Sequence, residues 1–439
     1  MKVSFISLGC AKNLVNTEQM MALCRDAGHT LLEEPSGADV VVINTCGFID
    51  SAKEEAIDTI LSVAQLKAEG QVQKILVTGC LTQRYQQEIL TELPEVDGIM
   101  GTGSYGEIVS ALAELMSGGR PCRFADIHGM LDEFDRVLTT PKHYAYLRIA
   151  EGCDNRCAYC VIPSLRGRYR SRPMEKVLAE ARRLADAGVK ECIVIAQDIT
   201  RYGIDLYGQR KLAALLHELC KLDFRWIRLH YLYPDEFTDE LIDTIASEEK
   251  VLPYLDIPIQ HCNDKVLKAM NRRGGKAELL ALFGTLRARI PHLVLRTSLI
   301  TGLPYEDEAA FEELCEFLQQ VRIERAGVFP YSPEEGTPAA KMLNRVDTDE
   351  AERRADLIVD VQSRIMDAFN DSRMGTVTEV LCDGFDSQAM MFVGRSYAES
   401  PDIDGRIYFV ADREVEAGAF VPVRITGAMD GELTGELAE

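Results

Sequence analysis

Three cysteines in one short loop constrain this chain more than any other feature of its sequence. Cys153, Cys157 and Cys160 are spaced as C-x-x-x-C-x-x-C, and the loop follows an apolar, strand-like segment, residues 144–149. A four-iron cluster usually takes four cysteine thiolates, so three either recruit a fourth ligand or leave one iron open to a small molecule. Zinc sites usually pair ligands as C-x-x-C with a second pair some distance away. The spacing therefore favours an iron–sulfur cluster over zinc.

A second set of cysteines is spread over the first 80 residues. Cys10, Cys46 and Cys80 each end a short apolar run, and a helical pattern follows each run. This arrangement predicts a Rossmann-like repeat of strand and helix with a period of about 35 residues. The carboxyl ends of parallel strands meet at one edge of a sheet, so we expect the three thiols to converge on a second cluster. Any one of them could instead be an ordinary buried cysteine.

Length and cysteine usage limit the class of protein. A chain of 439 residues should hold two or three domains, and no apolar run is long enough for a membrane helix. The first residues resemble a strand and not a signal peptide. Thirteen cysteines without a secretion signal indicate a reducing, cytoplasmic location. Seven of them share no spacing, and we interpret these as core or incidental residues: Cys24, Cys122, Cys192, Cys220, Cys262, Cys315 and Cys382.

The net charge of −22 argues against strong non-specific binding to nucleic acid, which depends on lysine and arginine. It favours a basic partner, although solubility alone would explain it equally well. The last segment is also acidic: residues 376–439 hold thirteen acids and four bases. Such a segment would repel phosphates and should prefer a protein rich in lysine and arginine.

Strand and helix patterns divide the chain into an α/β multidomain protein. Residues 1–122 form the parallel α/β repeat, and residues 139–372 contain six further strand–helix units, too few for a closed eight-fold barrel. A long helix is predicted from Asp347 to Arg373, with Thr348 as its N-cap. Residues 373–439 change to short alternating strands separated by Gly, Asp and Pro, which predicts a small antiparallel barrel of OB type.

The cluster loop resembles that of the radical S-adenosylmethionine (SAM) superfamily, in which an aromatic residue precedes the third cysteine, as Tyr159 does here. The whole chain resembles the methylthiotransferases, and within them the branch that modifies a small-subunit ribosomal protein, number twelve. Five segments carry this resemblance: residues 7–15, 44–54, 79–85, 162–167 and 171–173.

The resemblance implies a partial (β/α)6 radical SAM barrel, a C-terminal TRAM domain, two 4Fe-4S clusters, SAM and an electron donor. The cluster on Cys153, Cys157 and Cys160 would bind SAM and reduce it to a 5′-deoxyadenosyl radical. That radical would abstract hydrogen from the β-carbon of an aspartate. The second cluster would hold and deliver a sulfur methylated by a second SAM. Since the two open irons must face one cavity, we expect the first domain to pack against the mouth of the barrel.

Further contacts are predicted from position. Tyr159, Gln197, Asp198 and Arg296 lie in the cluster loop or on barrel strands and their ends, where they could reach SAM, as could residues 302–304. Lys12 and Asn13 follow Cys10 and could touch the sulfur donor. An ordinary structural role explains each position equally well.

Two alternatives stay open at this point. The first is a methylthiotransferase acting on a tRNA adenosine, for which the alternating Arg166, Arg168, Arg170 and Arg172 could form a phosphate-binding edge. The same arginines could equally be a solvated strand face. The second is a non-catalytic iron–sulfur protein for electron transfer, but an electron carrier needs fully ligated clusters, and two sets of three cysteines argue against it.

Overall fold

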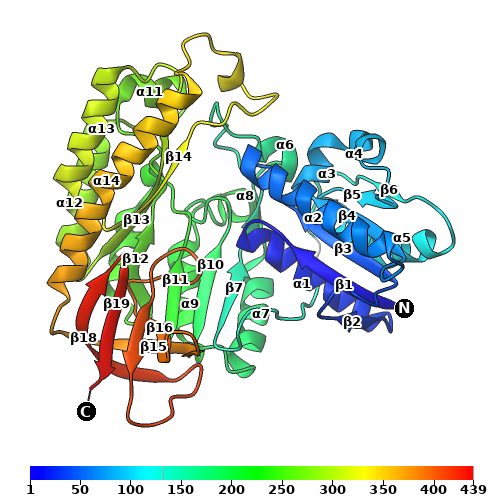
Figure 1. The fold of residues 1–439 in the computed structure, drawn as a ribbon. Coiled ribbons are helices and arrows are strands. Elements are labelled where there is room, and N and C mark those ends of the chain that lie inside the picture. The colour runs from blue at the N-terminus through cyan, green and yellow to red at the C-terminus, as the bar shows by residue number, and fades with distance from the viewer. Residues whose placement is uncertain (132, 439) are drawn as a thin grey trace.

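The computed structural model describes residues 1–131 and 133–438. Three units follow one another along the chain (Figure 1): an α/β sheet at the N-terminus, a larger α/β sheet, and a small β-barrel at the C-terminus. The predicted boundaries, 1–122, 139–372 and 373–439, remain a proposal, and Glu439 lies outside the described residues. Within the described residues, no helix is long and apolar enough to cross a membrane.

The first unit is a six-stranded parallel sheet of order β2-β1-β3-β4-β5-β6. Its strands are β1 (Lys2–Ser7), β2 (Thr30–Leu32), β3 (Val40–Thr45), β4 (Lys74–Gly79), β5 (Gly98–Met100) and β6 (Cys122–Arg123). Its helices are α1 (Ala11–Asp26), α2 (Asp50–Ala68), α3 (Cys80–Tyr85), α4 (Gln87–Glu92) and α5 (Ile108–Met116). The short edge strands β2 and β6 were not predicted from the sequence.

Successive side chains of each strand point to opposite faces of this sheet, and helices cover both faces. Val41 and Ile43 of β3 pack with α2 on one face, whereas Val40 and Val42 pack with α1 and α5 on the other. Strands buried on both faces read as continuous apolar runs, which is why the sequence predicted them. The helix predicted after Cys80 is divided into α3 and α4 at Gln86, whose φ is +43°.

The second unit is an open parallel sheet of six strands in the order β14-β13-β12-β11-β10-β7. Its strands are β7 (Tyr144–Arg148), β10 (Glu191–Ile195), β11 (Trp226–Leu229), β12 (Val251–Asp256), β13 (Val294–Thr301) and β14 (Arg325–Pro330). The helices that connect and cover them are α7 (Met174–Asp186), α9 (Leu212–Cys220), α10 (Asp239–Ser247), α12 (Lys276–Arg289), α13 (Glu308–Val321) and α14 (Thr348–Ser372). The expected partial barrel of six strands is confirmed.

Short elements shape the end of the sheet where the cluster loop lies. They are β8 (Ala150–Glu151), β9 (Arg170–Ser171), α6 (Ile162–Arg166), α8 (Ile204–Tyr207), α11 (Asp264–Ala269) and three 3₁₀ turns, η1 (Tyr105–Glu107), η2 (Pro234–Glu236) and η3 (Ala339–Lys341). Strands β8 and β9 pair antiparallel on either side of the cysteines. The prediction of Thr348 as the N-cap of α14 is wrong, since Asp347 is the cap and accepts a hydrogen bond from the Asp349 N–H at 3.1 Å.

The third unit is a closed five-stranded barrel of order β15-β16-β17-β19-β18. Its strands are β15 (Val377–Asp386), β16 (Met391–Arg395), β17 (Ile407–Val410), β18 (Phe420–Met429) and β19 (Glu432–Leu437). The expected barrel is confirmed, but it is not wholly antiparallel, because β17 and β19 pair in parallel. A closed ring with an odd number of strands cannot alternate direction throughout, so one parallel pair is unavoidable.

The small barrel docks at the amino ends of the larger sheet's strands. Trp226, the first residue of β11, packs edge-on against Phe420 at 4.8 Å between ring centroids. The loop between β16 and β17, residues 396–404, reaches into the concave side of the sheet, where Ser400 meets His230 at 2.9 Å and Asp404 accepts from Tyr254 at 2.6 Å. Residues 396–404 therefore extend from the amino ends of the strands into the partial barrel, as far as the residue that follows β11.

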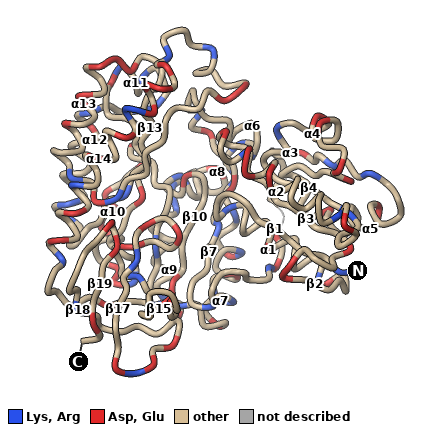
Figure 2. Tube along the Cα trace, viewed as in Figure 1, with Lys and Arg blue, Asp and Glu red and all other residues tan. Residues whose placement is uncertain are grey.

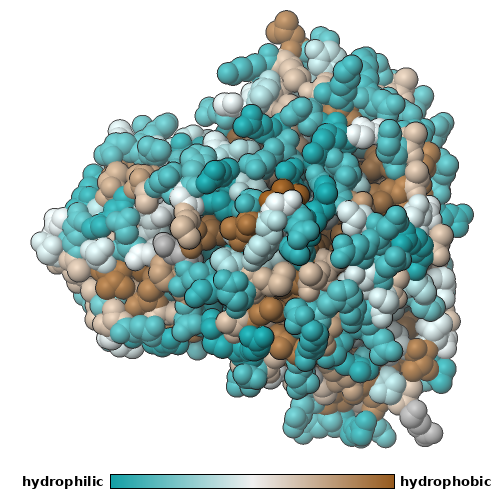
Figure 3. Space-filling view, turned by 180° about the vertical axis from the view of Figure 1, so that it is seen from behind, coloured by the Kyte–Doolittle hydropathy of each residue, from teal (hydrophilic) through white to brown (hydrophobic). Residues whose placement is uncertain are grey.

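The surface carries many charges of both signs. Figure 2 shows that acidic residues are spread over all three units and are not gathered on one. In the view from behind, hydrophilic residues cover most of the molecule and apolar residues occur in small groups (Figure 3).

Candidate functional site

The first unit packs against the mouth of the partial barrel, as the sequence led us to expect. Val15 of α1 belongs to one apolar cluster with Tyr146 of β7 and Ile193 of β10. Nearby, Cys80 at the start of α3 packs with Val161 and Leu165. The carboxyl ends of both sheets therefore face one another, and each cysteine set lies at such an end.

The N-terminal cysteines occupy equivalent positions in the repeat. Cys10 is the N-cap residue of α1, Cys46 follows β3, and Cys80 opens α3 directly after β4. Gly9, with φ of +85°, lets the chain pass close to Cys46, since a Cβ on Gly9 would stand 2.7 Å from the Cys46 Cβ. Asn13 contacts Cys80, with 4.0 Å between Oδ1 and Sγ. The fold thus gathers residues that are more than 30 positions apart.

The cysteines of the loop are surrounded by hydrogen-bond donors. The Asn155 N–H donates to the Cys153 sulfur and the Ile162 N–H to the Cys160 sulfur, each at 3.5 Å. The Tyr233 hydroxyl lies 3.5 Å from the sulfur of Cys157. Hydrogen bonds to the ligand sulfurs help to set the potential of a cluster, so this donor set fits an iron–sulfur group.

No three His, Cys, Asp or Glu side chains among residues 1–131 and 133–438 gather as ligands of a single metal ion. Each thiolate of a four-iron cluster binds a different iron, so its cysteines stand further apart than ligands of one ion.

Burial keeps most of these thiols protonated in the protein without metal. It raises the pKa of Cys46 to about 11, helped by the neighbouring Cys80 and Cys10, and likewise raises the pKa of Cys153 to about 11. Burial alone would also raise the pKa of Cys10, but the positive charges of Lys12 and Arg166 outweigh burial and lower this pKa. Since a bound metal requires thiolates, cluster assembly must displace these protons.

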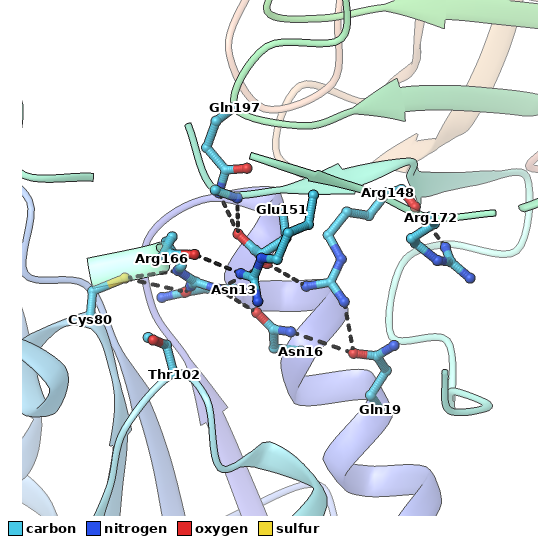
Figure 4. Close-up of polar contacts among 12 residues, drawn as sticks. Asn13, Asn16, Gln19, Cys80, Thr102, Arg148, Glu151, Arg166, Arg172 and Gln197 are labelled. Atoms are coloured by element: carbon cyan, nitrogen blue, oxygen red, sulfur yellow. Dashed lines mark hydrogen bonds and ion pairs between the residues drawn. The ribbon is translucent and has the colours of Figure 1, made fainter. Parts of the chain in front are cut away.

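A buried polar network joins the two units beside Cys80 (Figure 4). Arg166 of α6 donates to the Asn16 side chain at 2.8 Å, to the Cys80 sulfur at 3.3 Å and to Asn13. It also pairs with Glu151 at 3.3 Å, and Arg148 pairs with the same carboxylate at 2.7 Å. One arginine thus bonds a cysteine of the first unit and a carboxylate of the second.

Glu151 is the acidic centre of this network. Burial alone would raise its pKa, but the charges of Arg166 and Arg148 lower it to about 2. Gln197 donates to the other oxygen of the carboxylate at 2.5 Å. Glu151 therefore carries its charge at neutral pH and holds two arginines in fixed positions.

The four residues predicted to contact SAM have different partners in the structure. Tyr159 accepts from Arg272 at 3.1 Å beside Cys157, and the Oδ2 of Asp198 accepts from Asn155 of the cluster loop at 3.0 Å. The Oε1 of Gln197 is buried without a hydrogen-bond partner among the described residues, so it is available to a ligand. Arg296 pairs with Asp256 at 2.8 Å. Their contacts with SAM stay a prediction.

Lys12 and Asn13, the two residues predicted to touch the sulfur donor, have separate roles. The Asn13 side-chain amide donates to the carbonyls of Leu8 and Thr45, both at 3.0 Å, and thereby ties β1 to β3. Lys12 instead extends towards the barrel, with its Nζ 3.4 Å from the centroid of the Tyr231 ring. Asn13 supports the backbone around the cysteines, whereas Lys12 enters the space between the two units.

The alternating arginines do not form a phosphate-binding edge. Arg166 and Arg172 are buried, and Arg172 pairs with Glu180 at 2.6 Å. Arg170 donates to the backbone carbonyl of Gly129 at 3.0 Å. Only Arg168 of the four is exposed. Three of the four arginines therefore make contacts within the protein.

Sequence reasoning missed several residues around the loop. Arg272 lies over the Tyr233 ring at 4.5 Å and reaches the sulfur of Cys157 at 3.9 Å. Glu151 directly precedes Gly152 and the first cysteine, which was a usable signal. Tyr233 comes soon after β11 and Arg272 soon after α11, and nothing local marks either residue as a neighbour of the loop.

Three family models match successive parts of the chain. Residues 2–101 match "Uncharacterized protein family UPF0004", residues 147–318 match the radical SAM superfamily, and residues 374–438 match the TRAM domain. These ranges fall within the three units described above.

Curated relatives match the whole chain. A protein of Lachnoclostridium phytofermentans named ribosomal protein uS12 methylthiotransferase RimO is 47% identical, covering 99% of both chains. A protein of Clostridioides difficile with the same name is 43% identical over 100% of this chain and 99% of its own. A third, from Symbiobacterium thermophilum, is 47% identical over 100% of this chain and 91% of its own.

Solved structures share the fold at low identity. The radical SAM methyltransferase TsrM of Kitasatospora setae, with cobalamin and a [4Fe-4S] cluster bound, superposes with a TM-score of 0.58. It is 14% identical, and the match covers 77% of this chain and 76% of that chain. This likeness supports the fold alone.

Proposed function

Because this chain belongs to the RimO family of ribosomal protein uS12 methylthiotransferases, we propose that it transfers a methylthio group to the β-carbon of an aspartate in that protein. The enzyme is a radical SAM methylthiotransferase that uses SAM and two 4Fe-4S clusters. Its protein partner is uS12 of the small ribosomal subunit, and it also requires an electron donor. A cytoplasmic location is consistent with this substrate.

One observation supports this proposal above the others: the two sets of three cysteines lie at carboxyl strand ends that face each other across one mouth. Val15 of α1 and Ile193 of β10 share an apolar cluster there, and Arg166 bonds both Cys80 and Glu151. A methylthio transfer needs its sulfur and its carbon to meet within bonding distance. A carrier of single electrons has no such requirement.

We assign Cys10, Cys46 and Cys80 to the first cluster, and Cys153, Cys157 and Cys160 to the second, SAM-binding cluster. When bound, the clusters and SAM supply the reductive cleavage, the hydrogen abstraction and the sulfur. We further propose that Tyr159, Gln197, Asp198 and Arg296 line the region around SAM. Among these, the buried Oε1 of Gln197 is the atom most in need of a donor from a ligand.

The surrounding residues exclude water and hold the two units together. The small barrel docks at the amino ends of the strands and its residues 396–404 enter the partial barrel from there, so we expect substrates to enter from the opposite end. On that side, Glu334 of the loop after β14 pairs with Lys53 at 3.1 Å and with Arg84 at 2.5 Å, both from the first unit. A reactive radical requires such a closed surrounding, because water and stray side chains would otherwise compete for it.

The test is anaerobic reconstitution with iron and sulfide, followed by incubation with SAM, dithionite and either uS12 or tRNA. Mass spectrometry of both substrates should show the gain of one methylthio group on an aspartate of the protein. The same gain on a tRNA adenosine, with the protein unchanged, would contradict the proposal. The buried arginines after the cluster loop disfavour that alternative.

The division of labour between the cysteine sets can be tested by two matched variants. Cys157→Ala should abolish formation of 5′-deoxyadenosine, whereas Cys46→Ala should retain it and lose methylthio transfer. Iron and sulfide content of each variant should fall by about half, because each retains one complete three-cysteine site. A Cys46→Ala enzyme that still forms the product would refute the assignment.

A further inference from the structure

A buried lysine lies between the two cysteine sets. Lys12 is 8% exposed, and its Nζ stands 3.4 Å from the centroid of the Tyr231 ring. Lys12 follows Cys10 by two residues, while Tyr231 precedes Tyr233 by two, and the Tyr233 hydroxyl is 3.5 Å from the Cys157 sulfur. The ammonium group is therefore positioned where one cysteine set faces the other.

Two carboxylates on neighbouring strands, Glu151 and Asp256, already have other partners. Glu151 is bonded by Arg148 at 2.7 Å and by Arg166, and Asp256 is bonded by Arg296 at 2.8 Å. Within the part of the chain that the structure describes, no carboxylate lies within ion-pair distance of Lys12. The anionic group that Lys12 faces on its own helix is the thiolate of Cys10, a proposed cluster ligand, and the Tyr231 ring compensates a buried ammonium only in part. The ammonium therefore has no carboxylate partner among the described residues, and a ligand can bring one.

We propose that Lys12 binds the side-chain carboxylate of the substrate aspartate. This inference rests on the proposed function and adds the group that selects the substrate. The β-carbon of aspartate is bonded directly to the carboxylate carbon, so anchoring the carboxylate fixes the carbon to be modified between the two sets. The Tyr231 ring limits the positions that the ammonium can take.

The same contact accounts for selectivity. A neutral side chain or a nucleobase in this place would leave the ammonium of Lys12 buried and unpaired, and sites built for a charged or polar group reject ligands that lack it. Apart from Cys10 and the cluster proposed on it, the other anion available in the reaction is the carboxylate of SAM. If SAM were the occupant of this position, loss of Lys12 would impair SAM binding and cleavage instead of protein selectivity.

The test compares uS12 carrying its natural aspartate with uS12 carrying asparagine at that position. Wild-type enzyme should bind the aspartate protein more tightly, by roughly 10- to 100-fold, in anaerobic binding measurements without reductant. Lys12→Met should lose this preference, and Lys12→Arg should restore part of it. In turnover, Lys12→Met should raise KM for uS12 and leave the rate of 5′-deoxyadenosine formation near that of wild type.

Two further variants control for assembly. Lys53→Met removes another lysine of the first unit that contacts the second, through Glu334, but it lies outside the Lys12–Tyr231 pair and should retain the preference for aspartate. If Lys12→Met fails to incorporate iron, the Tyr231→Leu variant is tested in its place. This variant should also weaken the preference for the aspartate form of uS12.

The outcomes separate this inference from the proposed function. A wild-type enzyme that binds both forms of uS12 equally, or a Lys12→Met enzyme that still prefers aspartate, would overturn the role of Lys12. Loss of SAM binding in Lys12→Met with the preference intact would assign the lysine to SAM instead. A wild-type enzyme that prefers the aspartate protein but never modifies it would leave Lys12 as a binding residue and refute the reaction.

Discussion

At the scale of single residues, ion pairs and hydrogen bonds give the buried Arg166 a structural role between the two units. Arg166 has 3% of its surface exposed and bonds Asn16, Glu151 and Cys80 at once. Removal of one member of a buried ion pair leaves the other charge uncompensated, which is usually more costly than replacing the whole pair. Arg166 therefore holds the first unit against the second and orients Cys80.

We predict that Arg166→Gln lowers the apparent free energy of unfolding by about 3–5 kcal/mol, because it leaves Glu151 with less compensation. The variant should also bind less iron at the N-terminal cysteines, since Cys80 loses its neighbour. Denaturant titration and iron analysis are the measurements. Arg168→Gln, at the exposed arginine two residues on, is the matched control and should change stability by no more than about 0.5 kcal/mol. Equal stability of the two variants would show that the network is not needed for docking.

At the scale of elements, the β16–β17 loop explains how the small barrel is attached. Glu399, 1% exposed, pairs with Arg325 of β14 at 2.9 Å and with Arg373 at the end of α14. Arg395 of β16 pairs with Glu191 of β10 at 2.6 Å. The interface between barrel and sheet thus contains charges that are almost fully removed from water.

This interface should be sensitive to acid. Burial alone would raise the pKa of Glu399, but Arg373 and Arg325 lower it from about 4.5 to about 2. A carboxyl whose pKa is lowered in the folded state stabilises the protein above the unfolded value, and that contribution disappears as the pH falls through the folded value. The contribution of Glu399 should be complete above about pH 4.5 and lost on approach to pH 2.

Glu399→Gln tests this expectation. At pH 7 the variant should be less stable than wild type by about 3–5 kcal/mol, because Arg325 and Arg373 lose their counter-ion. The difference should shrink as the pH falls from about 4.5 to about 2, measured by thermal unfolding at each pH. The exposed Glu416→Gln serves as control and should follow wild type throughout. A difference that does not vary with pH would refute the electrostatic explanation.

At the scale of the whole molecule, the position of the small barrel changes how its acidity is understood. Five of its acids contact the larger sheet or its flanking residues: Glu379, Asp383, Glu399, Asp402 and Asp404. The barrel also sits at the amino ends of strands whose carboxyl ends carry the cluster loop. Asp412, Glu414 and Glu416 are exposed and can meet a partner, but the barrel that carries them lies away from the site of chemistry.

We predict that the exposed acids steer the basic substrate and do not orient it. Changing Asp412, Glu414 and Glu416 to lysine should weaken uS12 binding at low salt, mainly through a slower association rate, and have little effect at high salt. Stopped-flow association rates at several salt concentrations provide the measurement. Unchanged or tighter binding at low salt would remove the acidic barrel from substrate recognition.

The sequence alone determined most of the longer strands and helices and the topological place of both cysteine sets. Apolar runs that end in Cys10, Cys46 and Cys80 predict parallel strands, and parallel strands bring their carboxyl ends together whatever the rest of the chain does. Spacing within a loop is also local, so Cys153 and its two partners could be recognised without a structure. These inferences need only short segments and a general rule of topology.

Only the tertiary structure decided which charges face inward. Arg166 could have been a surface arginine, and Lys12 could have pointed to solvent, because the same residue types occur in both settings. Their partners, Glu151 and Tyr231, come from other elements, and the docking of the first unit onto the barrel brings them into contact. Local sequence carries no record of such docking, since the energy of a buried charge depends on groups far away along the chain.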